Sequence, residues 1–300
     1  MDNVLKYEGQ IRIRGLIFEL PRAAICKPGD AYIVDKAFEF VNKNTRMKVY
    51  PHDVLCYTGV DTGWVVLPKL CPIKVIYVIG QSNSGKDTLK KQFMDLLNFH
   101  VSDFEKEYNI PINHTNRPAR KNERYGIDYY FEDYSGKEIC ENFEKNESMI
   151  SIDNLDTSDF NVLSYSSFTV ANGDEWTYWT TLQDLDLNKI NIIFGDPLMF
   201  YLLNKDRTIY IGEENYVLKK EIIKLDCKPS VILERALKRC SNEPLKEEEM
   251  IRRFTSDQKM FCDFMLAEYG IKNYHVVKSD DENAFKDFLI KVDECKNLLK

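Results

Sequence analysis

The sequence has few of the residues from which several kinds of functional site are built. Its four histidines are scattered, and it contains no H-E-x-x-H pair. Its eight cysteines lie far apart and form no C-x-x-C pair, so their spacing does not predict a zinc site held by the protein. We expect these cysteines to be small buried thiols in a reducing cytoplasm.

Long apolar runs and an excess of positive charge are also missing. No run of eighteen apolar residues occurs, so no transmembrane helix is predicted, and the first residues lack the pattern of a secretory signal. The 41 basic and 48 acidic residues give a formal net charge of -7, which argues against a general nucleic-acid-binding surface. A local basic pocket for one small anion remains compatible with this charge. We expect a cytoplasmic protein that binds neither membrane nor nucleic acid.

The composition, with 44% hydrophobic and 30% charged residues in a chain of 300, is that of a globular protein with a sizeable core. Residues 1–72 differ from the rest, because short β-like runs alternate there with turn signals. They predict a small, mainly β accessory domain with one helical stretch near Lys36–Asn44 and a hairpin turn at 61–63. Tyr57 and Trp64 are expected in its core, with a binding role for these two residues as the alternative.

From Lys74 onward, apolar strands alternate with helices. This alternation predicts an α/β domain over 73–300, in which a parallel sheet carries helices on both faces. The expected strands are 74–80, 189–196, 221–227 and 273–280, and the expected helices are 86–100, 230–240, 247–270 and 282–299.

A phosphate-binding pattern lies between the first of these strands and the first helix. Gly80 to Lys86 matches G-x-x-x-x-G-K, whose glycines allow a tight loop with N–H groups that point at phosphate oxygens. The following helix presents its positive N-terminus, and Lys86 can reach the β- and γ-phosphates. The pattern predicts an ATP-binding loop made of Gly80, Ser82, Ser84, Gly85, Lys86, Asp87 and Thr88.

Asp87 stands where this pattern usually has a serine or threonine that binds Mg²⁺. A carboxylate could hold the ion directly or through water, so we predict Mg²⁺ as a cofactor and Asp87 as its ligand. The alternative is that Asp87, in the first turn, only complements the helix dipole.

A second anion site is predicted at a proline-containing turn. Arg117 and Arg120 flank Pro118 and form a fork suited to a phosphate, to which the hydroxyl of Tyr129 can add a donor. Alone, this turn would be interpreted as a solvated basic surface. In a chain that also has a phosphate loop, it predicts the binding site of a phosphorylated acceptor.

The motif T-x-R-x-x-R…E-x-x-G-x-D-Y-x-F, from Thr115 to Phe131, resembles the nucleoside-monophosphate-binding signature of the guanylate kinase family. The order of matching segments holds over residues 74–300. The resemblance implies a nucleoside-monophosphate-binding region at about 112–186 and a lid at about 228–256. It also implies phosphorylation of GMP or dGMP by ATP, with the acceptor phosphate held by Arg117, Arg120, Tyr129, Tyr178 and Thr180.

The same resemblance extends to the lid. The segment PSVILERALKRC resembles a lid helix of that family and gives Arg235 and Arg239, which are four residues apart and share a helix face. The next helix supplies Arg252 or Arg253, and we assign Arg253. The resemblance implies that these arginines and Lys86 neutralise charge on the transferring phosphoryl group. It also places Asp196 near base and metal, with a cap at the strand end as the alternative.

The sequence departs from the family where the base is recognised. Asn113 replaces a serine, Trp179 replaces a glycine, and no acid stands where the family has its base-recognising glutamate. The segment 132–176 is also longer and acidic, so Glu175 or an acid within it could substitute. The alternatives are a kinase for another (deoxy)nucleotide or phosphorylated small molecule, or a non-catalytic guanylate-kinase-like module that binds phosphopeptides.

The N-terminal domain has a weaker resemblance of its own. Part of it, GDAYIV…VLCYTGVDTGWVVLPKL, is similar to a short β motif of phage structural proteins. This resemblance implies a virus-encoded kinase that acts in the host cytoplasm. We further expect that the N-terminal domain could join copies of the chain into a homo-oligomer.

Overall fold

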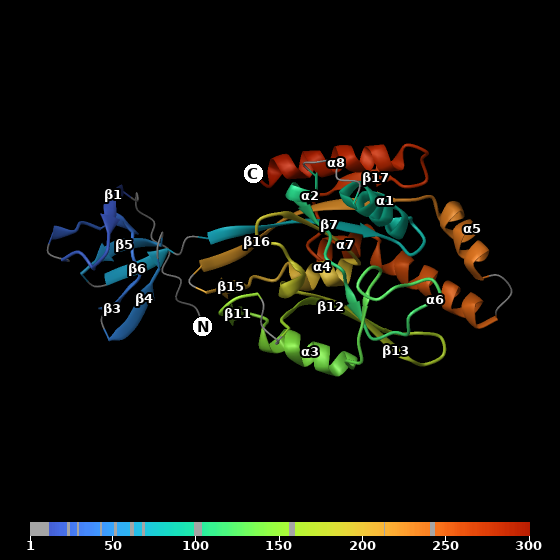
Figure 1. Ribbon diagram of the computed structural model, residues 1–300, viewed down its shortest axis with the longest axis horizontal. Coiled ribbons are helices and arrows are strands. Elements are labelled where there is room, and N and C mark those ends of the chain that lie inside the picture. The colour runs from blue at the N-terminus through green and yellow to red at the C-terminus, as the bar shows by residue number, and fades with distance from the viewer. Residues whose placement is uncertain are drawn as a thin grey trace. The chain divides into compact units, whose positions relative to one another are not determined.

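The computed structural model (Figure 1) shows a mixed α/β protein that divides into two compact units. One unit comprises residues 1–71, 151–154 and 208–217, and the other comprises 72–150, 155–207 and 218–300. No pattern in the sequence indicated that 151–154 and 208–217 would join the first unit. The structure describes residues 12–22, 25–28, 30–42, 44–50, 53–60, 63–67, 70–98, 104–155, 160–212, 214–240 and 244–300.

The first unit contains a four-stranded sheet in the order β1-β2-β5-β6 and a separate hairpin of β3 and β4. Tyr57 and Trp64 are buried in its core with ring centroids 5.1 Å apart, so they pack the module and are not exposed to a ligand. The Asn42 amide donates to the carbonyl of Trp64 at 2.7 Å and ties the hairpin to the sheet. The strands are β1 Arg12–Ile17, β2 Asp30–Val34, β3 Phe38–Asn42, β4 Thr45–Val49, β5 Val54–Gly59 and β6 Gly63–Leu67.

The predicted helical stretch near Lys36–Asn44 is wrong, because this segment contains strand β3. Burial alternates along β3, with Phe40 buried and Glu39 and Val41 exposed, which is the period of a strand with one buried face. The hairpin turn predicted at 61–63 falls largely on residues outside the described part of the chain. The strands on either side of it, β5 and β6, pair antiparallel.

A second hairpin in the first unit joins β15, Thr208–Ile211, to the beginning of β16, Glu214–Asp226. Gly212 has a φ of 61°, a left-handed conformation that glycine adopts without strain. Its N–H donates to the carbonyl of Ile152, in β11, Met149–Ile152.

Parallel strands form the central sheet of the second unit. β14, Ile190–Gly195, pairs parallel with β7, Leu70–Gly80, and with β8, Tyr108–Asn109. β16 pairs parallel with β17, His275–Lys278. Every residue of β14 is buried, as expected for a parallel strand with both faces covered.

Helices cover both faces of this sheet (Figure 1). α1, Lys86–Asn98, and α8, Ala284–Leu298, share one apolar core with the sheet, in which the rings of Phe93 and Phe288 are 6.0 Å apart. On the other face, α4, Pro197–Leu203, places Phe200 edge-on against Tyr77, with centroids 5.3 Å apart.

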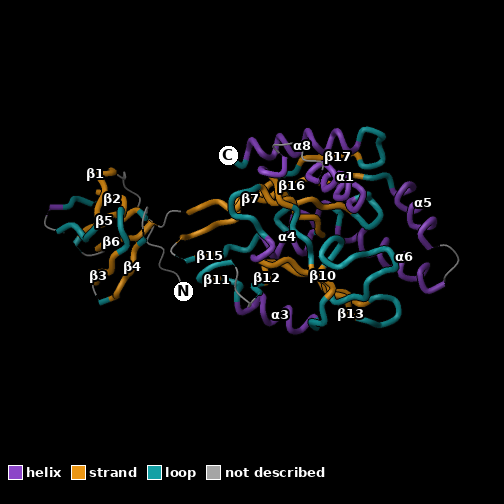
Figure 2. Tube along the Cα trace, in the orientation of Figure 1, coloured by secondary structure: helices purple, strands orange, loops and turns teal. Residues whose placement is uncertain are grey.

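A second sheet, in the order β10-β9-β13-β12, packs against α3, Gly136–Lys145 (Figure 2). β12 and β13 form an antiparallel hairpin whose turn is closed by two hydrogen bonds between Val170 and residues 173–174. The sequence analysis predicted none of the strands of this largely antiparallel sheet. Its strands are β9 His114–Thr115, β10 Tyr130–Phe131, β12 Val162–Thr169 and β13 Glu175–Thr181.

The single helix predicted over 247–270 is divided into two. Cys262 has extended backbone angles, φ −69° and ψ 149°, and therefore separates them. The remaining helices are α2 Phe104–Glu107, α5 Pro229–Cys240, α6 Pro244–Met260 and α7 Asp263–Glu268.

The described cysteines differ in burial. Among them, Cys56 and Cys295 are buried, but Cys262 is exposed, so the expectation of uniformly buried thiols was wrong. None of the described helices has both the length and the apolar character needed to span a membrane.

Candidate functional site

The predicted phosphate loop connects the end of β7 to the beginning of α1. Asn83 and Gly85 adopt positive φ angles of 63° and 103°, which turn the chain tightly before Lys86. At Gly80, a Cβ atom would lie 2.6 Å from the Ser84 hydroxyl and 3.0 Å from the Cβ of Leu225. Glycine is therefore favoured at both positions, at Gly85 because of its positive φ and at Gly80 because of close packing.

The side chain of Lys86 folds back over the loop. Its ammonium donates to the carbonyls of Gly80 and, at 3.0 Å, Gln81. Burial lowers the pKa of Lys86, although the carboxylates of nearby acids oppose the shift, chiefly Asp87 and Asp257. The lysine is therefore a partly desolvated cation at the point where phosphates are predicted to bind.

Ser84 is buried, and within the described part of the chain its hydroxyl has no hydrogen-bond partner. Asp87 and Thr88 lie exposed in the first turn of α1. The remaining predicted loop residue, Ser82, uses its backbone N–H to donate to the carboxylate of Asp257 on α6.

The two arginines predicted on one face of α5 both reach the phosphate loop. Arg235 donates to the carbonyl of Asn83 at 3.3 Å and to the carbonyl of Ser279 at 3.1 Å. Arg239 donates to the side-chain oxygen of Asn83 at 2.9 Å. The spacing of four residues thus brings both guanidinium groups to the same residue of the loop.

A pocket of about 440 Å³ lies at the carboxyl ends of β16 and β17. It is linked to the loop by Arg235, which contacts Cys227 of the pocket at 3.7 Å as well as Asn83. Its lining residues are Asp226, Cys227, Lys228, Pro229, Lys278, Asp280 and Asp281.

Arg117 is the centre of the predicted acceptor site. Its guanidinium makes a two-point ion pair with Glu123, at 2.6 and 2.7 Å, and donates to the Tyr178 hydroxyl at 2.9 Å. It also lies 4.9 Å from the ring centroid of Tyr129. Burial disfavours the charge, but Glu123 and Tyr178 outweigh burial and raise the pKa of Arg117.

The acceptor cluster borders the beginning of α1. Burial raises the pKa of Tyr129, and the negative charge of Asp87 raises it further. The Lys90 ammonium lies 5.9 Å from the Tyr129 ring centroid. Arg120, whose side chain is 57% exposed, adds a second cation next to Glu123. The cluster around Arg117 therefore lies next to α1, the helix that follows the predicted phosphate loop.

Helix α6 contacts the β12–β13 hairpin, which we call the acceptor hairpin, through its two arginines. Arg252 and Arg253 both pair with Glu249, at 2.8 and 2.5 Å. Burial opposes ionisation of Glu249, but the two arginines hold its pKa at about 2. Arg252 lies 5.1 Å from the ring centroid of Phe168, which stacks on Tyr178 with centroids 5.7 Å apart.

Two residues predicted to contact the acceptor are buried against each other. The Thr180 hydroxyl donates to the side-chain oxygen of Asn113 at 3.1 Å, and the Asn113 amide donates to the carbonyl of Phe194 at 2.9 Å. Both side chains are therefore buried and engaged in hydrogen bonds within the protein.

Asp196 caps helix α4, since its carboxylate accepts from the N–H of Met199 at 2.9 Å. Burial raises the pKa of Asp196. The hydrogen bonds from Met199 and Ser166 and the positive charge of Lys86 act in the opposite direction and lower it. The cap that the sequence allowed as an alternative is therefore present, within the electrostatic range of Lys86.

Glu175 lies on the far face of strand β13. Alternation in a strand places Tyr178 and Thr180 on one face and Glu175 on the other. A Cβ atom at Gly136, the first residue of α3, would lie 2.4 Å from a Glu175 carboxylate oxygen. Glu175 therefore faces α3, on the side of the strand opposite Tyr178.

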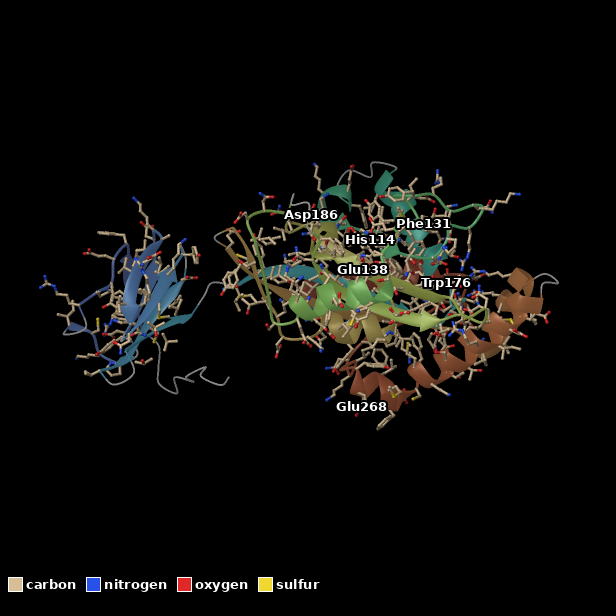
Figure 3. All side chains as sticks on the ribbon, turned by 90° about the horizontal axis from the view of Figure 1, so that it is seen from below. His114, Phe131, Glu138, Trp176, Asp186 and Glu268 are labelled. Atoms are coloured by element: carbon tan, nitrogen blue, oxygen red, sulfur yellow. The ribbon has the colours of Figure 1, made fainter. Side chains whose placement is uncertain are left out.

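Three residues of this region were not predicted from the sequence to belong to a site. Asp257 and Glu249 are ordinary polar residues of a long helix, and no motif marked them. His114 lies in β9 between the carboxylates of Glu132 and Asp184, at 2.9 and 3.1 Å, and stacks on Trp179. Figure 3 labels His114, along with Phe131 and Trp176 from the neighbouring strands.

Asp87 is the predicted magnesium ligand. Among the described residues, no group of three or more His, Cys, Asp or Glu side chains could hold a metal by itself. Mg²⁺ bound with nucleotides takes one or two carboxylates and completes its shell with phosphates and water. The exposed carboxylate of Asp87, next to the loop, fits that kind of site.

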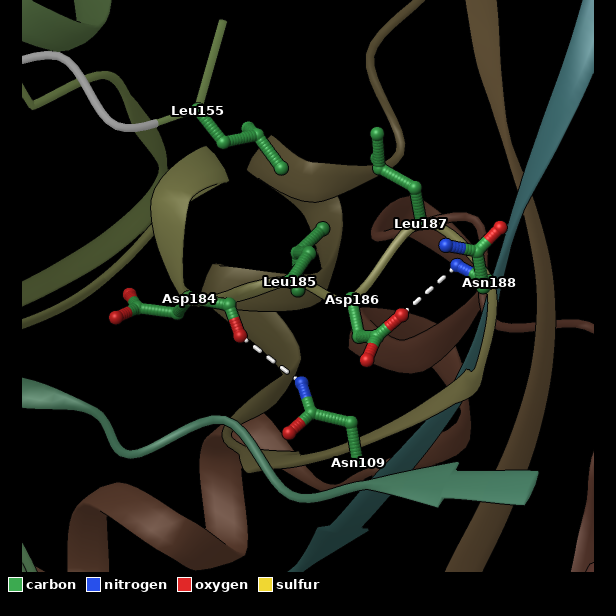
Figure 4. Close-up of a pocket in the computed structure, with 7 residues that line it drawn as sticks. All are labelled: Asn109, Leu155, Asp184, Leu185, Asp186, Leu187 and Asn188. Carbon is green, nitrogen blue, oxygen red and sulfur yellow. Dashed lines mark hydrogen bonds between the residues drawn. The ribbon is translucent and has the colours of Figure 1, made fainter. Parts of the chain in front are cut away.

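A further pocket, of about 330 Å³, lies at the opposite end of β14 from the loop (Figure 4). The Asn109 amide donates to the carbonyl of Asp184 at 3.0 Å, and the N–H of Asn188 donates to Asp186 at 2.9 Å. None of the predicted site residues lines this pocket.

The loop and the arginine clusters thus gather several cationic groups in a mixed α/β protein. No family model matches the sequence, and no curated protein matches it. Among solved structures, the crystal structure of guanylate kinase from Anaplasma phagocytophilum is distantly similar, with a TM-score of 0.38 and 15% identity. The match covers 77% of this chain and 87% of that chain.

Proposed function

We propose that the protein transfers a phosphoryl group from ATP to a nucleoside monophosphate. The observation that carries the proposal is a contact between the two regions: the ammonium of Lys90, on the helix that follows the phosphate loop, lies 5.9 Å from the ring centroid of Tyr129 in the cluster around Arg117. Two separate sets of cationic groups for phosphates thus border α1. A protein that only bound one nucleotide would need the first set alone.

On the donor side, the loop N–H groups and Lys86 would hold the phosphates of ATP. Arg235 and Arg239 contact the loop at Asn83, so they can neutralise charge on the same phosphates. The pocket next to Arg235 is the place proposed for the base of the donor. Asp87 would hold Mg²⁺, which when bound supplies positive charge to the donor phosphates.

On the acceptor side, Arg117, Arg120, Tyr129 and Tyr178 would hold the monophosphate. One of its oxygens attacks the γ-phosphorus of ATP, the bond from that phosphorus to the bridging oxygen breaks, and ADP leaves. This reaction depends mainly on positioning and on neutralised charge. Arg253, on the helix that touches the acceptor hairpin, is the further cation proposed for it.

GMP and dGMP are the acceptors that we propose, because the motif from Thr115 to Phe131 is the one that resembles a guanine-nucleotide site. Asn113 and Thr180 are committed to internal hydrogen bonds, and Glu175 lies on the far face of its strand. Recognition of the base would therefore differ from that in the family. A site that lacks a matching polar partner loses discrimination by several orders of magnitude.

The test is a coupled assay of ADP release with ATP, Mg²⁺ and a panel of ribo- and deoxynucleoside monophosphates. We expect turnover that depends on the added monophosphate, highest with GMP or dGMP. Turnover with another nucleotide alone would keep the kinase and reject the guanine assignment. No turnover with any of them, together with measurable phosphopeptide binding, would replace the kinase by a binding module.

A further inference from the structure

A carboxylate on α6 accepts a hydrogen bond from the backbone of the phosphate loop. The backbone N–H of Ser82 donates to the carboxylate of Asp257, 175 residues further along the chain. The next residue of α6, Gln258, places its amide 3.4 Å from the side-chain oxygen of Gln81. Helix α6 therefore contacts the loop at two consecutive positions.

The partner of Asp257 is the kind of group that such a loop uses for phosphate. Successive backbone N–H groups in a glycine-bounded turn form a concave site for anions. A carboxylate is an anion of similar hydrogen-bonding character, and a bond from N–H to a charged acceptor is stronger than a neutral one. The charge of Asp257 also acts on Lys86, the other phosphate-binding group of the loop.

We propose that Asp257 is the resident anion of the phosphate loop and that a donor polyphosphate binds by displacing it. The inference rests on the proposed donor role of the loop. Asp257 thereby lowers the affinity of the loop for every ligand whose phosphate must reach the N–H of Ser82. A ligand without phosphates does not compete with it.

Asp257 lies on the same helix, α6, as Arg252 and Arg253. Arg253 precedes Asp257 by four residues, so the two side chains share one face of α6. Arg252 and Arg253 are both engaged by Glu249. When a phosphate displaces Asp257 from the N–H of Ser82, this face of α6 loses its hydrogen bond to the loop.

The test measures dissociation constants of pyrophosphate, MgATP and adenosine by calorimetry for the wild type, Asp257→Ala and Asp257→Asn. Asp257→Ala is expected to tighten pyrophosphate and MgATP binding about tenfold, the equivalent of one hydrogen bond to a charged group. Asp257→Asn changes affinity in the same direction but less, because its amide oxygen can still accept from Ser82. Adenosine binding is expected to stay unchanged.

The control is Glu248→Gln, which removes the same charge from an exposed position on α6. Glu248 is nine residues, or two and a half turns, from Asp257, so it faces the opposite side of the helix. We expect its affinities to match those of the wild type. Equal tightening by Glu248→Gln would mean that net charge alone is responsible and would overturn the proposal.

Two further outcomes would also overturn it. Unchanged pyrophosphate affinity in a folded Asp257→Ala protein would show that the carboxylate does not compete. Weaker MgATP binding with unchanged pyrophosphate binding would show that Asp257 holds the cation instead. If neither the wild type nor any variant binds a polyphosphate, the proposed donor site itself fails, which is distinct from a failure of displacement.

Discussion

Arg117 and Glu123 form a two-point ion pair at 2.6 and 2.7 Å in which the arginine side chain is only 1% exposed. The same carboxylate accepts the backbone N–H of Arg120 at 2.9 Å, yet the Arg120 side chain is 57% exposed. The two arginines that the sequence presents as an equal pair therefore have different surroundings. One is part of the packed fold, and the other is presented to solvent.

This difference predicts separate effects for the two alanine variants. Arg120→Ala should raise the acceptor KM at least about tenfold, through loss of a charge-assisted contact, with donor affinity nearly intact. Its free energy of unfolding should change by less than about 0.5 kcal/mol. Arg117→Ala should also destabilise the fold by about 3 kcal/mol, because it leaves Glu123 without its buried partner.

Steady-state kinetics with each substrate varied in turn, and unfolding in urea, measure these effects. Equal loss of donor and acceptor affinity in Arg120→Ala would show that the acceptor site has been misplaced. Equal stability of the two variants would contradict the structural role given to Arg117.

Replacement of Asp87 tests the magnesium assignment. Asp87→Ala should raise the Mg²⁺ concentration for half-maximal activity about tenfold, with a smaller effect on nucleotide affinity. Asp95→Ala, at an exposed position further along α1, is the matched control and should leave the magnesium dependence unchanged. An unchanged magnesium dependence in Asp87→Ala would leave this residue with the helix-dipole role alone.

The histidine between two carboxylates predicts a pH-dependent stability. Burial opposes the charge of His114, but Asp184 and Glu132 outweigh it and raise the pKa. A group whose pKa is raised by folding stabilises fully below its unfolded pKa, about 6.5 for histidine, and loses that stabilisation as the pH rises through the folded pKa. The stability lost in His114→Gln should therefore be largest near pH 6 and should shrink toward pH 9.

Urea unfolding of both proteins at several pH values within that range measures the gap. Parallel curves for wild type and His114→Gln would mean that the imidazole acts only by packing on Trp179. The acceptor KM of both proteins, measured at the same pH values, shows whether β9 positions Arg117 and Arg120. A higher KM in His114→Gln is expected if it does.

Two glycines with positive φ allow the effect of backbone strain to be distinguished from loss of a binding site. Gly85, with φ 103°, lies in the phosphate loop, and Gly173, with φ 91°, lies at the turn of the β12–β13 hairpin. An alanine at either position is strained by about 1–2 kcal/mol, and a Cβ at Gly173 meets no atom within 4 Å. Both variants should lose similar stability, but only Gly85→Ala should weaken MgATP binding. Equal donor affinity in the two variants would contradict the role given to the loop.

Strands and helices could be predicted where a short segment of sequence carries its own hydrophobic pattern. The strands at Lys74–Gly80 and Ile190–Gly195 are apolar runs, and α1 follows a glycine turn, so their positions were close to those observed. The error at 36–44 arose because a short segment with apolar residues at alternate positions also contains helix-forming residues. No strand was predicted where the β12–β13 hairpin lies, Val162–Thr169 and Glu175–Thr181.

The sequence by itself determined which residue types are available for phosphate: the glycines, Lys86, and the arginines at 117, 120, 235 and 239. Spacing determined that Arg235 and Arg239 share a face, because helix geometry is local. Only the tertiary structure decided that Arg117 is buried on Glu123, that Glu175 faces α3, and that Asp257 reaches the N–H of Ser82. The contacts of Glu175 and Asp257, and the bond from Arg117 to Tyr178, join segments far apart in the chain. The packing of whole sheets and helices, which no local pattern encodes, sets their partners.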